Sequence, residues 1–101
     1  MYKVIFHNQN KLFEVYAEHV SMSNIFGFVE VSKFTFSESG QILLDVAEEK
    51  LRHEFEGVDF SLIPMQAIVR IDSVKERGTA RITDSASGNV MPFPGLPPQK
   101  T

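Results

Sequence analysis

The sequence predicts a mainly β (α+β) domain, in which a bent antiparallel five-stranded sheet or open barrel is accompanied by one amphipathic helix near residues 45–56. Apolar and polar residues alternate along residues 2–7 and 12–19, which is the period of a half-buried strand. Residues 45–56 alone have the period of a helix. The chain of 101 residues is long enough for one core, and nine Phe without any Trp supply its bulk.

The first two strands are expected to form a β-hairpin. Residues 2–7 and 12–19 are separated by Asn8-Gln9-Asn10. Asparagine tolerates positive φ and hydrogen-bonds to its neighbouring backbone, so this tripeptide is typical of a turn. The two strands should therefore pair in the antiparallel direction.

A third strand is expected over residues 25–36. Val29 and Val31 are odd-numbered and share one face, whereas Phe34 and Phe36 are even-numbered and have the opposite parity. A β-bulge near Ser32-Lys33 would bring both sets to one face and bend the strand. This strand is therefore the expected source of the strong bend in the sheet.

Residues 45–56 are expected to form an amphipathic helix of about three turns, after a short strand or lead-in at residues 41–44. Asp45 is a good N-cap, Glu48 completes a pattern like a capping box, and Gly57 is the expected stop. The apolar stripe consists of Ala47, Leu51 and Phe55.

Two further long β segments are expected at residues 58–63 and 64–74, and a short closing strand at residues 80–83. Pro64 has no amide donor and so belongs at a strand start or on an edge. The stretch of residues 61–78 is strongly apolar before it ends in the densest basic cluster of the chain. We interpret this stretch as the structural centre of the fold, on which closure and assembly depend.

The expected domain organisation is a single β-rich domain at residues 1–83 and a Pro/Gly-rich extended C-terminal tail at residues 84–101. Four of the five prolines lie in this tail. The sequence has no cysteine, no signal-peptide pattern at its start and no apolar run near the roughly 20 residues of a membrane-spanning helix. These features predict a cytoplasmic protein without a membrane partner.

The charge balance argues against a general polyanion binder, because the net charge is −3 and the isoelectric point is about 5.5. A local basic turn is the exception: Lys75, Arg77, Gly78 and Arg81 are the candidate nucleic-acid-binding residues. The alternative for this turn is an exposed loop kept soluble by its charge.

Self-association has its own candidate residues. Arg70 and Asp72 lie on one face of their expected strand and could form an ion pair that stabilises the sheet or contacts a partner. Pro94 lies in a proline-rich segment, residues 91–98, that could dock in a groove of a neighbouring subunit or simply fray.

Catalytic and metal sites are not expected. His53-Glu54 resembles the start of a zinc-protease helix, but the second histidine of that motif is replaced by Gly57. The acids of the helix are explained by capping and a solvated face. No phosphate loop, dinucleotide fingerprint or nucleophile elbow is present, so we expect no cofactor and no small-molecule substrate. A small enzyme that uses His7, His19 or Asp72 is the remaining alternative.

The order of the segments resembles one family over nearly the whole chain. The opening MYKVIFHNQNKLFEVYA, the central GFVEV, the run LIPMQAIVRIDSV and the late PFP are similar to a family of small bacterial proteins, domain of unknown function number 1820. This resemblance implies a bacterial cytoplasmic protein without an assigned activity, and it transfers no catalytic residue.

A second resemblance is to the Sm-like fold, a strongly bent five-stranded sheet that curls into an open barrel. Arg77-Gly78 is similar to the Arg-Gly of the second Sm motif, which helps to bind uridine-rich RNA in that family. This chain departs from the pattern because it begins with a strand and lacks a counterpart of the Asp and Asn of the first motif. The resemblance implies assembly through strand edges.

The function expected from the sequence is a non-enzymatic binding or assembly module of Sm-like type, which self-associates through β edges into a dimer or ring. An RNA-binding protein that uses the basic turn Lys75–Arg81 is the first alternative, and a small enzyme of unknown reaction is the second.

Overall fold

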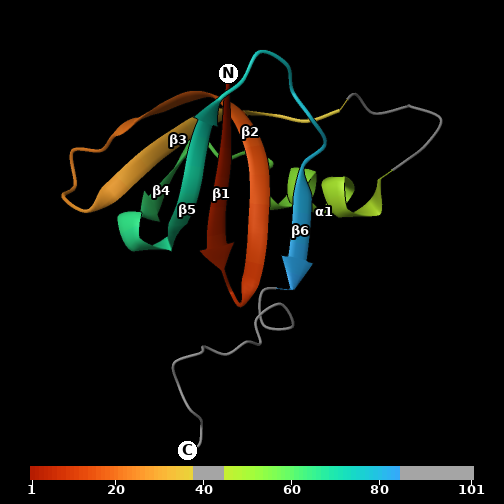
Figure 1. The fold of residues 1–101 in the computed structure, drawn as a ribbon, viewed down its shortest axis with the longest axis horizontal. Helices are drawn as coiled ribbons and strands as arrows, with labels where there is room; N and C mark the ends of the chain where they lie inside the picture. The colour runs from red at the N-terminus through yellow and green to blue at the C-terminus, as the bar shows by residue number, and fades with distance from the viewer. Residues whose placement is uncertain (38–44, 85–101) are drawn as a thin grey trace, which may run out of the picture.

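A computed structural model describes residues 1–37 and 45–84 of the chain. Six strands and one α-helix are found in these residues (Figure 1). In chain order the elements are β1 (Tyr2–Asn8), β2 (Lys11–Met22), β3 (Phe28–Thr35), α1 (Val46–Glu54), β4 (Phe60–Pro64), the 3-10 turn η1 (Met65–Ala67), β5 (Ile68–Ser73) and β6 (Arg81–Asp84). The expected strand at residues 41–44 and the tail beyond Asp84 lie outside the described residues.

The strands form one antiparallel sheet with the order β4-β3-β2-β1-β5. The long strand β2 pairs with two strands along one of its edges. Its first part, Lys11–Glu14, pairs with β6, and its second part, Tyr16–Met22, pairs with β3. The sheet thus has six strands, where the sequence predicted five, and it is not closed. Its two outer strands, β4 and β5, follow each other in the chain and are joined only by η1. A sheet whose opposite edges are linked by three residues must curl, as Figure 1 shows.

The predicted hairpin of β1 and β2 is confirmed. The two strands pair from Tyr2 opposite Ala17 to Asn8 opposite Lys11, which leaves a two-residue turn. Both turn residues have positive φ, 55° at Gln9 and 63° at Asn10. This is the conformation of a type I′ turn, whose twist matches that of the flanking strands.

The predicted bend in β3 is present, but its cause differs from the predicted bulge. The register with β2 is the same on both sides of Lys33, so no extra residue is inserted. Lys33 instead has a φ of 59°, which rotates the following residues relative to the preceding ones. As a result Val31 is buried, and Phe34 also packs against the core.

The helix agrees with its predicted signals. The Glu48 amide donates to Asp45 Oδ1 over 3.1 Å, so Asp45 is the N-cap. Glu48 and Glu49 lie in the first turn, near the positive end of the helix dipole. Gly57 follows with a φ of 79°, a conformation that favours glycine.

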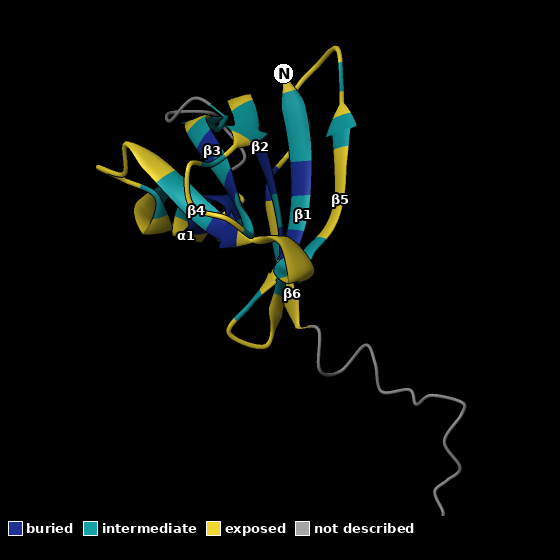
Figure 2. Ribbon diagram, turned by 90° about the vertical axis from the view of Figure 1, so that its left-hand side faces the viewer, coloured by how far each residue is buried: buried dark blue, intermediate teal, exposed yellow. Residues whose placement is uncertain are grey.

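The prediction for residues 58–74 was partly wrong. Pro64 ends β4 instead of opening a long strand, and η1 then separates β4 from β5. Strand β5 is an edge strand with mostly exposed residues, so residues 61–78 are not the centre of the fold (Figure 2). The apolar residues of β5 lie on an edge strand. Sequence alone did not distinguish such an apolar edge strand from a central strand. The short closing strand was predicted correctly, since β6 pairs with β2.

The core lies between the concave face of the sheet and α1. It is densest on β1 and β2, where the Phe6 and Phe13 rings are 5.2 Å apart. Leu51 is the residue by which α1 enters this core. The buried cluster consists of Val4, Phe6, Phe13, Val15, Ala17, Val29, Val31, Leu51, Ile63 and Ala80.

Candidate functional site

The free edge of β5 can be assigned from one hydrogen bond. The Val74 amide donates to the Met1 carbonyl over 2.9 Å, so these residues are a hydrogen-bonded pair of the β1–β5 ladder. Such pairs alternate with non-bonded pairs in an antiparallel ladder. The backbone N–H and C=O groups of Ile71 and Ser73 therefore point away from β1, toward the open edge of the sheet.

Apolar side chains accompany this unpaired backbone. Val69 is 53% exposed and Ile71 is 37% exposed. Ile71 lies opposite the buried Val4 in the ladder and shares its face, yet remains accessible because no strand follows β5. Burial of such surface contributes about 25 cal/mol per Å², so a partner strand here would be favoured.

The ion pair predicted on this strand is present. Arg70 Nε lies 3.0 Å from Asp72 Oδ1, and both side chains flank Ile71 on the face opposite to it. Asp72 also stands opposite Lys3 of β1 in the register. The two charges neutralise each other, so β5 carries no net charge that would repel another strand.

The second free edge belongs to β4. The Met65 amide donates to the Gly27 carbonyl over 2.8 Å, so these residues are a hydrogen-bonded pair of the β3–β4 ladder. Hydrogen-bonded and non-bonded pairs alternate from there along the two strands. Leu62 and Phe60 therefore direct their backbone groups away from β3. Pro64 occupies an outward position of the same kind, where its missing N–H removes no bond from the ladder. Phe60 adds an aromatic side chain that is 51% exposed.

Of the predicted basic residues, Lys75 and Arg77 lie in the loop before β6, and Arg81 is the first residue of β6. Lys75, Arg77 and Arg81 are exposed, and none of them forms an ion pair within residues 1–37 and 45–84. Gly78 has a structural explanation, because a Cβ at this position would lie 2.5 Å from the Tyr16 hydroxyl oxygen. The glycine of the Arg77-Gly78 dipeptide is thus explained by the close approach of this loop to Tyr16 of β2, without requiring a role in RNA binding.

A buried carboxylate was missed by the sequence prediction. Glu48 was assigned to capping and a solvated face, but it is only 3% exposed. Its Oε2 accepts hydrogen bonds from the Ala80 amide at 3.2 Å and from the Ser37 amide at 3.3 Å. Glu48 thus ties α1 to the end of β3 and to the residue before β6. The available signal was its spacing, since position 48 lies three residues before Leu51 on the apolar side of the helix.

The groups considered for catalysis are not joined to one another. Asp72 pairs with Arg70, and His53 Nδ1 lies 3.3 Å from Glu56 Oε1. Among the described residues, neither the His7 nor the His19 side chain forms a hydrogen bond or ion pair, and no cluster of three or more His, Asp or Glu could hold a metal ion. The absence of enzymatic activity stays a prediction.

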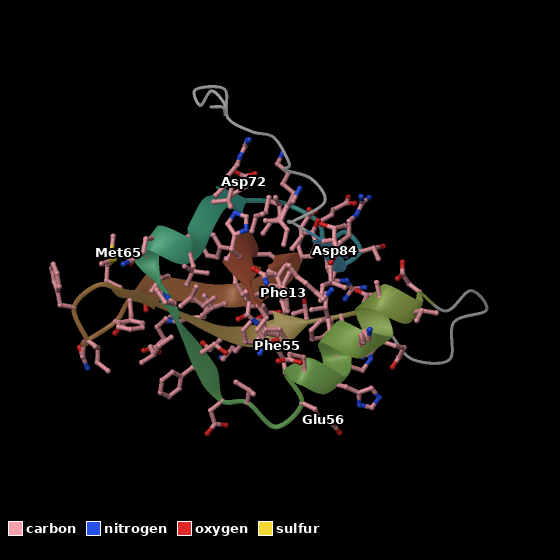
Figure 3. The ribbon with its side chains drawn as sticks, turned by 90° about the horizontal axis from the view of Figure 1, so that it is seen from below. Phe13, Phe55, Glu56, Met65, Asp72 and Asp84 are labelled. Carbon is pink, nitrogen blue, oxygen red and sulfur yellow. The ribbon has the colours of Figure 1, made fainter. Side chains whose placement is uncertain are left out.

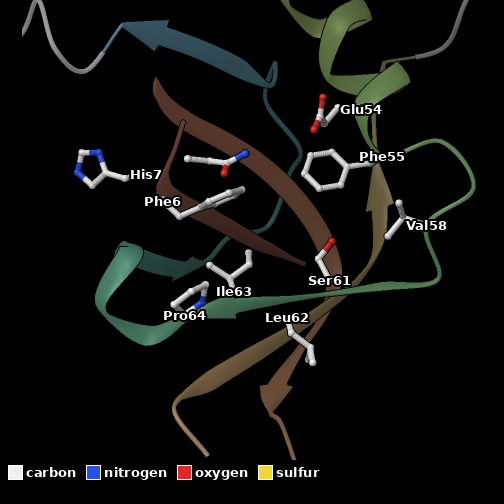
Figure 4. Close-up of a pocket in the computed structure, with 10 residues that line it drawn as sticks. Phe6, His7, Glu54, Phe55, Val58, Ser61, Leu62, Ile63 and Pro64 are labelled. Carbon is white, nitrogen blue, oxygen red and sulfur yellow. The ribbon is translucent and has the colours of Figure 1, made fainter. Parts of the chain in front are cut away.

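One small cavity lies where β1, β4 and the end of α1 meet. Its volume is about 300 Å³, and its apolar walls include Phe6, Phe55 and Ile63 (Figure 4). Polar side chains also line it, namely His7, Asn8, Glu54 and Ser61.

The fold is a curled antiparallel β domain in which β4 and β5, at the two ends of the main strand order, each pair on one side only, as does the short strand β6. Residues 1–95 match the model of the family described as "Domain of unknown function (DUF1820)", and the chain belongs to this family. Neither a curated protein nor a solved structure matches the chain. No helix among the described residues is long and apolar enough to span a bilayer.

Proposed function

We propose that this protein is a non-enzymatic assembly module of Sm-like type, which self-associates by pairing the β5 edge of one copy with the β4 edge of another. The observation that supports this proposal is the presence of two unpaired strand edges, each with exposed apolar side chains. Unpaired edges of this kind are templates for strand addition unless the protein protects them.

Pairing of unlike edges is favoured over pairing of like edges for a simple reason. A dimer formed through β5 alone would leave Phe60 and the outward backbone of β4 uncovered. Head-to-tail pairing covers both edges in every copy and generates a ring if the rotation closes. The bent path from β4 to β5 is compatible with the Sm-like description, while the helix position and the sixth strand distinguish this chain from the usual pattern.

Light scattering on the pure full-length chain over a range of concentrations tests the proposal. We expect an oligomer for the natural chain and a smaller species for Ile71→Pro, because proline removes an outward amide without removing a bond to β1. Ile71→Ala is the matched control for the lost side chain, since it keeps the amide and should weaken assembly less. A natural chain that remains monomeric at high concentration would contradict the proposal.

Binding of single-stranded RNA is a second candidate function. It is favoured by the three exposed cations Lys75, Arg77 and Arg81, which have no ion-pair partner among the described residues. Phosphate groups would supply the missing counter-charge.

A further inference from the structure

An aromatic groove lies between the end of β3 and the last turn of α1. Its volume is about 590 Å³, which is within the range of ligand-binding pockets. Phe34 and Phe55 stack inside it with ring centroids 4.2 Å apart, and Phe36 and Val58 extend its apolar surface. All four side chains remain partly or largely accessible.

The groove is held in shape by contacts around its rim. Arg52 lies over the Phe36 ring at 5.7 Å and donates a hydrogen bond to the Ser37 carbonyl. Arg52 Nε also lies 3.3 Å from Glu49 Oε2. Figure 3 shows Phe55 and Glu56 at this end of α1, with Phe55 on the side of the sheet. Three aromatic rings beside fixed polar groups form a surface that is typical of sites for proline-rich segments.

The chain itself contains such a segment, Met91–Gly95, with the sequence Met-Pro-Phe-Pro-Gly. It lies outside the described residues, but the family match extends to residue 95 and so includes it. Proline fixes φ near the extended value, so a Pro-Phe-Pro unit loses little conformational entropy on binding. Phe93 between the two prolines supplies a ring for an aromatic surface.

The geometry allows this segment to reach the groove of its own chain. Asp84, the last residue of β6, lines a hollow together with Val46 and Lys50 from the first half of α1. The groove begins at the other end of this nine-residue helix, which is about 14 Å long. The seven residue steps from Asp84 to Met91 span up to about 23 Å when extended. The connection is therefore long enough to run along α1.

We propose that the groove formed by Phe34, Phe36, Phe55 and Val58 binds the proline-rich segment Met91–Gly95 of the same chain. The segment then covers the exposed aromatic surface and packs against the end of α1, where Arg52 donates a hydrogen bond to the Ser37 carbonyl. This inference does not depend on edge-to-edge assembly, because it is argued from the aromatic rings of the groove and from the Pro-Phe-Pro sequence. Val58 and Asp59 of the groove directly precede Phe60, the first residue of β4.

Paramagnetic relaxation in the full-length chain tests the inference, because the natural sequence has no cysteine. A nitroxide attached at Gln99→Cys should broaden the amide signals of Phe34, Phe55 and Val58 more than that of Asn24 at the tip of the β2–β3 hairpin. Adding Phe93→Ser should abolish the selective broadening, whereas the matched substitution Lys100→Ser should preserve it. Equal broadening at the groove and the hairpin tip would overturn the inference.

A groove variant and a mixing experiment complete the test. Val58→Asp, at a side chain that is 38% exposed, should abolish the broadening of Phe34 and Phe55 while the remaining spectrum stays that of a folded chain. Isotope-labelled chains without a nitroxide, mixed with unlabelled nitroxide chains, should show no groove broadening. Broadening in this mixture would show that a second copy supplies the segment, and it would overturn binding within one chain.

Discussion

Removal of the buried carboxylate of Glu48 should loosen three parts of the fold together. Glu48→Ala leaves the Ala80 and Ser37 amides without the oxygen that accepts both of them at 3.2 and 3.3 Å. A buried donor without a partner costs about 1–3 kcal/mol. The Ser37 amide is only partly buried, so water recovers some of that loss, and we expect a total loss of about 2–4 kcal/mol in the free energy of unfolding.

Two variants separate the role of the oxygen from that of the charge. Glu48→Gln keeps one carbonyl oxygen that can accept both amides, so it should lose about 1 kcal/mol as the hydrogen bonds cease to be charge-assisted. Glu49→Ala is the matched control on the neighbouring position. It removes a partly exposed ion pair with Arg52 and a first-turn charge near the positive end of the helix dipole, and should lower stability by about 1 kcal/mol or less.

Urea unfolding followed by circular dichroism measures all three variants. A loss of about 2–4 kcal/mol in a chain of this size corresponds to a melting temperature lower by about 10–20 °C. Equal stability of Glu48→Ala and Glu49→Ala would refute the reasoning, because it would mean that the two amides gain nothing from the Glu48 carboxylate.

Two further predictions concern the loop between β5 and β6. Gly78→Ala should lower the free energy of unfolding by about 1–3 kcal/mol, because the new Cβ would lie 2.5 Å from the Tyr16 hydroxyl oxygen. Thermal melts of the double variant with Tyr16→Phe should show partial recovery, and a double variant no more stable than Gly78→Ala would contradict this cause. If the basic residues Lys75, Arg77 and Arg81 bind single-stranded RNA, fluorescence anisotropy should show affinity falling about 20-fold between about 50 and 200 mM salt. The paired change Arg77→Glu and Arg81→Glu should then abolish binding, and a natural chain that binds no RNA at low salt would remove this candidate.

Local signals were sufficient for the elements whose cause is local. The β1–β2 hairpin depends on two turn residues at positive φ, and the sequence Asn8-Gln9-Asn10 favours that conformation. The helix depends on Asp45 at its start and Gly57 after its end, and both act as predicted. The bend near Lys33 was also located correctly, because the parity of the apolar residues changes there.

Features determined by distant contacts were not predictable in the same way. Whether β5 is central or at an edge depends on which strand pairs with its far side, and its apolar composition is compatible with both. Pro64 is acceptable at either end of an edge strand, so the sequence did not show that the chain turns after it. Glu48 is buried because amides 11 and 32 residues away lie next to it, and no local pattern contains those partners.

The arrangement of the free edges gives the most direct test of the proposed assembly. Ile71→Pro blocks the outward amide of β5, and Leu62→Pro blocks the outward amide of β4, while each chain keeps one intact edge. If β5 of one copy pairs with β4 of the next, each variant alone should be monomeric and an equal mixture should form a dimer in sedimentation velocity. Persistence of the natural oligomer in both variants, or the absence of any dimer in the mixture, would contradict edge-to-edge assembly.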